Sequence, residues 1–172
     1  MLHRGRHPIC IGVGQTQYGS VPMQQQPIVG IIANPASGRD IRRLTAKASV
    51  FPTVEKANMI QRVLGALGAT GIARVLMMPD MTGIAAAVKR AVAAHAAESH
   101  IRWPEVEFME MDISESVDDT FNAVELMCRR GVAAIVVLGG DGTHRAVAMR
   151  CGETPMATLS TGTLSLIHIS EP

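Results

Sequence analysis

Aromatic residues are scarce in this sequence, at 3% of its 172 positions. Hydrophobic residues nevertheless make up 47%, so we expect a core built from alanine, valine, isoleucine, leucine and methionine. Long apolar runs are also missing, since none approaches the roughly 18 residues that a membrane span requires. The basic N-terminus is followed only by a short, glycine-interrupted apolar stretch, which is not a signal-peptide pattern. These absences favour a globular domain without a membrane partner.

The cysteine content and the net charge exclude further classes of protein. The cysteines are Cys10, Cys128 and Cys151, an odd and sparse set without disulfide-type or metal-type spacing. Such a set favours a reducing cytoplasm, and it predicts no metal-binding residues. The net charge is +1, which gives no basis for binding nucleic acid.

Apolar runs alternate with helical patterns from position 28 onward. Strands are expected over residues 28–33, 73–78, 106–111, 134–138 and 156–159. Helices are expected over residues 40–48, 54–67 and 145–151, with two more beginning near Ile84 and at the cap residue Ser116. Gly68 and Gly71 are expected to end the second helix, and Gly131 the helix that Ser116 begins. The alternation predicts an α/β fold with a parallel sheet and right-handed crossovers.

The most informative stretch is Gly139-Gly140-Asp141-Gly142-Thr143, which directly follows an apolar run. Its three glycines lack the Cβ atoms that would keep backbone N–H groups away from a phosphate. The Asp141 carboxylate would repel a bound phosphate unless it binds a metal ion or takes a proton from a nucleophile. The stretch therefore indicates phosphoryl transfer. The alternative interpretation is a tight turn, in which glycine and aspartate are common for backbone reasons.

Two further loops should lie at the same edge of the sheet, because ligands of parallel sheets bind beyond the carboxyl ends of the strands. One is Asn34-Pro35-Ala36-Ser37-Gly38, and the other is Ser160-Thr161-Gly162-Thr163. Asp80 and Asp112 also follow strands, but capping of the next helix is the favoured interpretation for both.

These motifs resemble the superfamily of NAD kinases, diacylglycerol and sphingosine-type lipid kinases and, more distantly, phosphofructokinases. Residues 31–44 and 75–80 are similar to the ATP-NAD kinase-like branch that includes the acetoin-catabolism X proteins. The resemblance covers about residues 27–163. It implies a Rossmann-like, three-layer, parallel-sheet N-terminal domain of the NAD kinase/lipid kinase fold, facing a β-rich C-terminal domain.

The resemblance also implies an ATP- and Mg²⁺-dependent phosphotransferase that converts NAD to NADP. A lipid or other small hydroxyl compound as acceptor, and a non-catalytic nucleotide-binding regulatory protein, are the alternatives. Asp141 is the implied catalytic residue, which orients or deprotonates the acceptor hydroxyl or helps to hold Mg²⁺. The implied nucleotide contacts are Asn34, Ser37, Gly38, Gly139, Gly140, Gly142, Thr143, Thr161 and Gly162. Small-molecule nucleotides are the expected partners, and the full-length protein is expected to be a homo-oligomer.

Three segments are expected along the chain. Residues 1–22 have the composition of a leader or a non-native flexible segment, and residues 23–163 form the nucleotide-binding kinase domain. Residues 164–172 resemble the translated read-through of a sequencing adapter and are expected to be non-native. On this interpretation the β-rich C-terminal domain is missing, and the fragment is expected to be inactive by itself.

Overall fold

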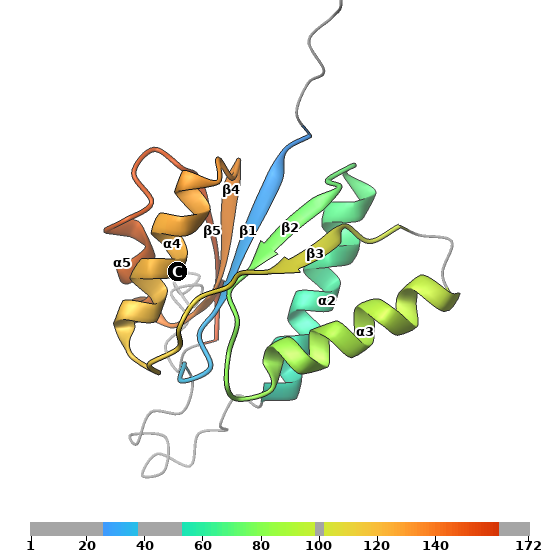
Figure 1. Cartoon of the computed structure of the whole chain (residues 1–172), viewed down its shortest axis with the longest axis horizontal. Coiled ribbons are helices and arrows are strands. Elements are labelled where there is room, and N and C mark those ends of the chain that lie inside the picture. The colour runs from blue at the N-terminus through green and yellow to red at the C-terminus, as the bar shows by residue number, and fades with distance from the viewer. Residues whose placement is uncertain (1–25, 38–52, 99–101, 162–172) are drawn as a thin grey trace, which may run out of the picture.

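The computed structural model describes residues 26–37, 53–98 and 102–161. The strands of these segments are β1 (Ile28–Ala33), β2 (Arg74–Met77), β3 (Glu105–Phe108), β4 (Ala134–Gly139) and β5 (Met156–Ser160). The helices are α2 (Thr53–Ala69), α3 (Ile84–Glu98), α4 (Val117–Arg129) and α5 (Asp141–Ala148). All neighbouring strands are parallel, in the order β3-β2-β1-β4-β5 (Figure 1). The predicted α/β fold with a parallel sheet is confirmed.

Some expectations fall outside these segments. The predicted helix over residues 40–48 lies there, as do Gly38, Gly162 and the stretches 1–22 and 164–172. Among the described residues, the helices are too short or too polar to cross a membrane.

Helices cover both faces of the sheet and make three layers (Figure 1). Side chains alternate along β1, so Val29 and Ile31 pack in the cluster of α2 and α3, whereas Ile32 packs in the cluster of α4 and α5. Because both faces are buried, β1 is an uninterrupted apolar run rather than an alternating one. At Gly30 a Cβ atom would lie 2.5 Å from Met127 Sδ, so the glycine allows α4 to pack close to the strand.

Two helices end in the hydrogen-bond pattern of a Schellman motif, with glycine in the left-handed conformation. After α2, Gly71 has a φ of 84°, and the N–H of Ile72 donates to the carbonyl of Leu67 at 3.0 Å. After α4, Gly131 has a φ of 68°, which confirms it as the end of that helix. Gly68 was wrongly predicted to end α2, since the helix continues to Ala69. A Cβ atom at Gly68 would collide with the Arg102 carbonyl oxygen, so close packing explains this glycine.

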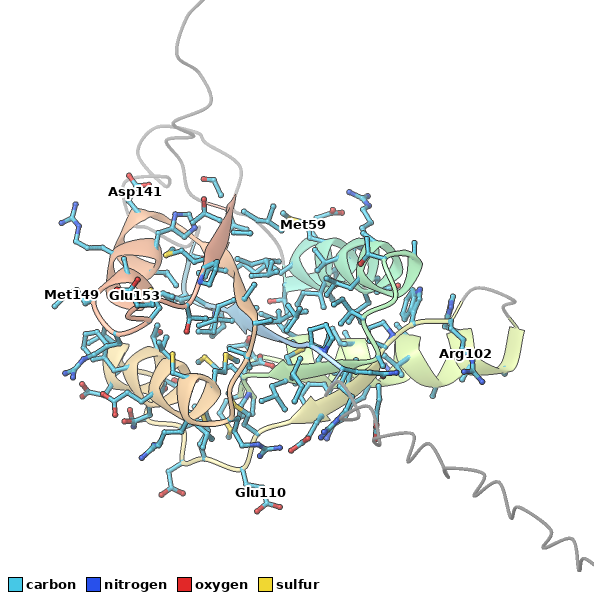
Figure 2. The ribbon with its side chains drawn as sticks, turned by 90° about the horizontal axis from the view of Figure 1, so that it is seen from above. Met59, Arg102, Glu110, Asp141, Met149 and Glu153 are labelled. Atoms are coloured by element: carbon cyan, nitrogen blue, oxygen red, sulfur yellow. The ribbon has the colours of Figure 1, made fainter. Side chains whose placement is uncertain are left out.

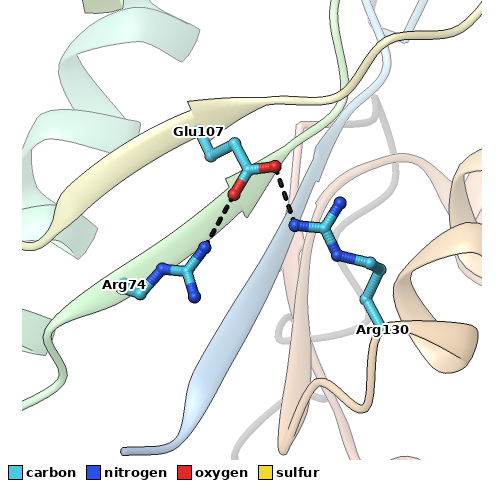
Figure 3. Close-up of polar contacts among 3 residues, drawn as sticks. All are labelled: Arg74, Glu107 and Arg130. Carbon is cyan, nitrogen blue, oxygen red and sulfur yellow. Dashed lines mark hydrogen bonds and ion pairs between the residues drawn. The ribbon is translucent and has the colours of Figure 1, made fainter.

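The edge strand β3 carries an ion-pair network on its exposed surface (Figure 3). Glu107 accepts from Arg130 at 2.8 Å and from Arg74 at 2.9 Å, which joins β3 to β2 and to the end of α4. The hydrogen bond from Arg130 is the main cause that lowers the pKa of Glu107. Glu107 therefore has a structural role in the sheet, although the strand expected over residues 106–111 spans only Glu105–Phe108.

Candidate active site

The strand order places a topological switch point between β1 and β4. From β1 the chain builds the sheet outward through β2 and β3, and β4 then begins the opposite half. Loops on the two sides of such a point diverge and leave a crevice at the carboxyl edge of the sheet. Here the loops after β1 and β4 stay joined at their base, because the N–H of Asn34 donates to the carbonyl of Leu138 at 3.0 Å.

Side chains from three loops meet at this edge. Asn34 Nδ2 donates to Thr143 Oγ1 at 2.8 Å, which links the loop after β1 to the start of α5. The hydroxyls of Ser37 and Thr161 lie 2.7 Å apart, which links the same loop to the end of β5. Thr161 is further fixed because its N–H donates to the carbonyl of Gly139 at 2.9 Å. The structure therefore brings together predicted site residues from all three loops, while their role in nucleotide binding stays a prediction.

The Gly139–Thr143 stretch differs from the predicted glycine loop. Helix α5 was expected over residues 145–151, but it begins at Asp141, with Gly140 as its N-cap. Asp141, Gly142 and Thr143 consequently form the first helical turn, where backbone N–H groups have no partner within the helix. Such a helix start favours anions in general, because the helix dipole adds a positive partial charge there. The pattern of residues 145–151 was apolar enough to indicate a helix, but the glycines concealed its start.

Asp141 and Thr143 occupy this turn in different ways. The Asp141 side chain is exposed and projects outward from the beginning of α5 (Figure 2). Thr143 is 6% exposed, and its hydroxyl accepts the Asn34 amide hydrogen. Among the described residues, nothing accepts the hydrogen of the Thr143 hydroxyl, so this group keeps a donor at the edge of the sheet.

Different physical features explain the glycines at positions 139 and 142. A Cβ atom at Gly139 would lie 2.5 Å from Thr143 Cβ, so glycine is needed there for packing within the protein. A Cβ atom at Gly142 would meet nothing within 4 Å, and its φ is not in the left-handed region. As far as residues 26–37, 53–98 and 102–161 are concerned, neither packing nor backbone conformation therefore requires glycine at position 142.

Lys56 is the residue that sequence reasoning missed. Its side chain is 1% exposed, and its ammonium group donates to the carbonyls of Asn34, Pro35 and Ser37 at 2.9, 2.9 and 2.6 Å. Lysine is almost never fully buried unless its charge is paired or hydrogen-bonded. A signal was present in the sequence, because Lys56 stands four and eight positions before Ile60 and Leu64 on the buried stripe of α2.

Asp80 caps the start of α3, as the favoured interpretation predicted. Its carboxylate accepts from the N–H groups of Thr82, Ile84 and Ala85 and from the Thr82 hydroxyl, at 2.6 to 3.1 Å. Burial favours a higher pKa, but these hydrogen bonds outweigh it and hold the pKa of Asp80 below its usual range. Asp112 is exposed on the segment after β3, and the structure shows no capping bond from it among the described residues.

The described part of this edge offers few protein ligands for a metal ion. The described residues contain no group of three or more histidine, cysteine, aspartate or glutamate side chains arranged to hold a metal ion. Mg²⁺ in nucleotide sites is held mostly by the phosphates and by one or two carboxylates, and the exposed Asp141 carboxylate fits that requirement. His144, next to the motif, has a buried Nε2 atom with no hydrogen-bond partner among the described residues.

Comparisons with known proteins point to one family. Residues 29–171 match the family model described as the ATP-NAD kinase N-terminal domain. Acetoin catabolism protein X of Cupriavidus necator is 48% identical over 140 residues, which cover 81% of this chain and 39% of that protein. The chain thus spans about two fifths of the length of this curated relative. No solved structure matches the chain.

Proposed function

The chain belongs to the ATP-NAD kinase family, and from this premise we propose that it carries the nucleotide-binding part of a phosphotransferase. The proposed reaction moves phosphate from ATP to the 2′-hydroxyl of NAD and gives NADP. Phosphoryl transfer requires mainly positioning and charge stabilisation from the protein, which the carboxyl edge at β1 and β4 can supply.

The observation that carries the proposal is Gly142. This residue lies in the first turn of α5, beside an exposed carboxylate, and neither packing nor φ requires a glycine there. A phosphate resting on the free N–H groups of the turn would need the space that a Cβ atom would fill. The proposal therefore gives this glycine a reason that the protein alone does not.

The hydroxyl groups at the edge have two kinds of role: some bond within the protein, and one is assigned to bind the phosphate. Ser37 Oγ donates its hydrogen to the Asn34 carbonyl at 2.8 Å, so the Thr161 hydroxyl is the donor in its bond with Ser37. Both of these hydrogens are used within the protein. Within the described segments no group accepts the hydrogen of the Thr143 hydroxyl, and we assign this hydroxyl to donate to phosphate.

Asp141 is assigned to the acceptor hydroxyl. In this role its exposed carboxylate orients that hydroxyl and takes its proton as the bond to phosphorus forms. Mg²⁺ bound with the nucleotide would supply neutralisation of the phosphate charge, and Asp141 is the described carboxylate at the start of α5 that can help to hold it.

The experiment is NADP formation by the full-length protein that contains this domain, with MgATP and NAD. Asp141→Asn is expected to lower kcat by about 100-fold or more while MgATP still binds, because the amide keeps the shape but accepts no proton. Glu153→Gln is the matched control, since it also removes a carboxylate but lies beyond the far end of α5 (Figure 2). An unchanged rate in Asp141→Asn removes Asp141 from its assigned role.

A second acceptor class has support from the relative named above. That protein's name refers to acetoin catabolism and not to NAD. A lipid or another small hydroxyl compound is therefore the alternative acceptor of the same reaction. Phosphorylated product with such a compound, and none with NAD, would select this alternative. Saturable MgATP binding without product from any acceptor would instead select a nucleotide-binding regulatory protein.

A further inference from the structure

A buried charge lies directly beneath the candidate active site. Lys56, in the first turns of α2, donates to three carbonyls of the first loop, which we define as residues 34–37. Removing an ammonium group from water is unfavourable unless its hydrogen bonds are replaced. An apolar residue would continue the buried stripe of Ile60 and Leu64 without that penalty. A charge at position 56 therefore points to a task other than filling the core.

The contacts of the first loop show what this task is. Its carbonyl oxygens turn toward Lys56, and its side chains reach the other two loops through the Asn34–Thr143 and Ser37–Thr161 bonds. The Asn34 side chain also accepts from the N–H of Ala36 at 2.8 Å, which closes the turn upon itself. Lys56 thus fixes the backbone from which Asn34 sets the position of the Thr143 hydroxyl.

Electrostatics point in the same direction. Three carbonyl groups of the first loop direct their negative oxygen ends at Lys56. If these oxygens faced the edge of the sheet instead, they would repel a phosphate bound there. This orientation of the carbonyl groups favours an anion bound above the first loop.

We propose that Lys56 is a positioning residue that sets the nucleotide affinity of this site by holding the first loop. The inference rests on the proposed function, because the nucleotide is the ligand whose affinity it explains. Lys56 itself touches the loop and not the nucleotide. Its loss should therefore weaken binding through the displaced Asn34 and Thr143 side chains.

The test is an NMR titration of the ¹⁵N-labelled chain with MgATP, comparing wild type, Lys56→Met and Ile60→Ala. Ile60 is the matched control, because it is a fully buried residue one turn further along α2 that packs in the core. Dissociation constants are read from the signals of folded molecules alone, so a variant that is merely less stable keeps the wild-type value. Amide hydrogen exchange at Ala36 and Ser37 is measured on the same samples.

Lys56→Met is expected to raise the dissociation constant for MgATP at least tenfold and to speed exchange at Ala36 and Ser37. Ile60→Ala is expected to change the dissociation constant less than twofold. Equal affinity in Lys56→Met and wild type, with wild type binding MgATP, overturns this inference and leaves the proposed function standing. A wild-type chain that does not respond to MgATP overturns both.

If Lys56→Met does not fold, the proposal can still be tested by observing the ammonium signal of Lys56 itself in a chain that keeps this lysine. The sequence has three lysines, Lys47, Lys56 and Lys89, so Lys47→Arg combined with Lys89→Arg leaves one lysine ammonium signal to observe. Buried and hydrogen-bonded, this ammonium should exchange slowly with water and should shift with the same dissociation constant as the Gly142 amide. A signal that stays in place while the Gly142 amide moves contradicts the proposal.

Discussion

The glycines at positions 139 and 142 show how residues of one type in one motif serve different ends. Gly139 makes room for the Thr143 side chain, which would otherwise meet a Cβ atom at 2.5 Å. Gly142 borders open space, where a Cβ atom would meet nothing within 4 Å. The sequence predicted one purpose, access for phosphate, for all three glycines of the motif. It could not show the packing purpose of Gly139, because that depends on where the Thr143 side chain lies after folding.

Alanine substitutions should separate the two purposes. Gly139→Ala is expected to lower the free energy of unfolding by about 1 to 3 kcal/mol, as overpacking does, because Thr143 must move. Gly142→Ala is expected to leave it unchanged or to raise it by up to about 1 kcal/mol, since alanine is the better helix former. Only Gly142→Ala should then combine full stability with weakened MgATP binding. Urea denaturation and MgATP titration check this pair, and a Gly142→Ala variant that binds as tightly as wild type contradicts it.

At the scale of the elements, periodicity predicted α2 closely, but it placed the start of α5 at residue 145 instead of Asp141 and did not show the contacts of the helices with neighbouring segments. Gly68 was expected to stop α2, as a glycine near the end of a periodic pattern commonly does. The helix continues through Gly68 to Ala69, and the close approach of the Arg102 carbonyl explains the glycine at position 68. Gly71 supplies the left-handed residue instead. Lys56 was overlooked for a related reason: its three acceptors are backbone groups, which a sequence pattern does not display.

The two glycines inside α2 provide a prediction with an internal control. Gly68→Ala is expected to lower the free energy of unfolding by about 2 to 3 kcal/mol, because the new methyl group meets backbone rather than a movable side chain. At Gly65 the nearest atom to a Cβ is Trp103 Nε1 at 3.5 Å, which is an ordinary contact. Gly65→Ala should therefore gain up to about 1 kcal/mol from helix propensity. Equal stabilities of the two variants in urea would show that α2 and the Arg102 segment are not packed as described.

The start of α3 should respond to pH through Asp80. Its pKa is lower in the folded chain than in the unfolded chain, so its stabilisation is fully present above the unfolded value, about 3.9. That stabilisation is lost as the pH falls through the lower, folded pKa. Asp80→Ala should reduce the free energy of unfolding by about 1 to 2 kcal/mol at pH 7, as loss of a cap does. Denaturation at pH 7, 4 and 2 should show the difference from wild type shrinking with acidity, and a constant difference would exclude an ionised cap.

For the whole molecule, the alternation of strands and helices was enough to predict the parallel sheet, and the candidate site at its carboxyl edge stays a prediction. The same pattern placed Asn34, Thr143 and Thr161 at that edge. It could not predict that Asn34 bonds to Thr143, 109 positions away, or that three loops interlock, because strand order and loop direction are set by packing. The order β3-β2-β1-β4-β5 supplies the missing information, since it places the loops after β1 and β4 side by side.

The central claim is that this edge of the sheet binds the nucleotide, and mapping MgATP onto the backbone amides by NMR tests it most directly. The amides of Asn34, Ala36, Ser37 and residues 140–143 should shift together with one dissociation constant. Gly71, Gly131 and Gly152, which stand in the turns before β2, β4 and β5 at the opposite edge, should stay unchanged. Shifts confined to the opposite edge, or unmoved signals at the start of α5 under saturating MgATP, would contradict the account.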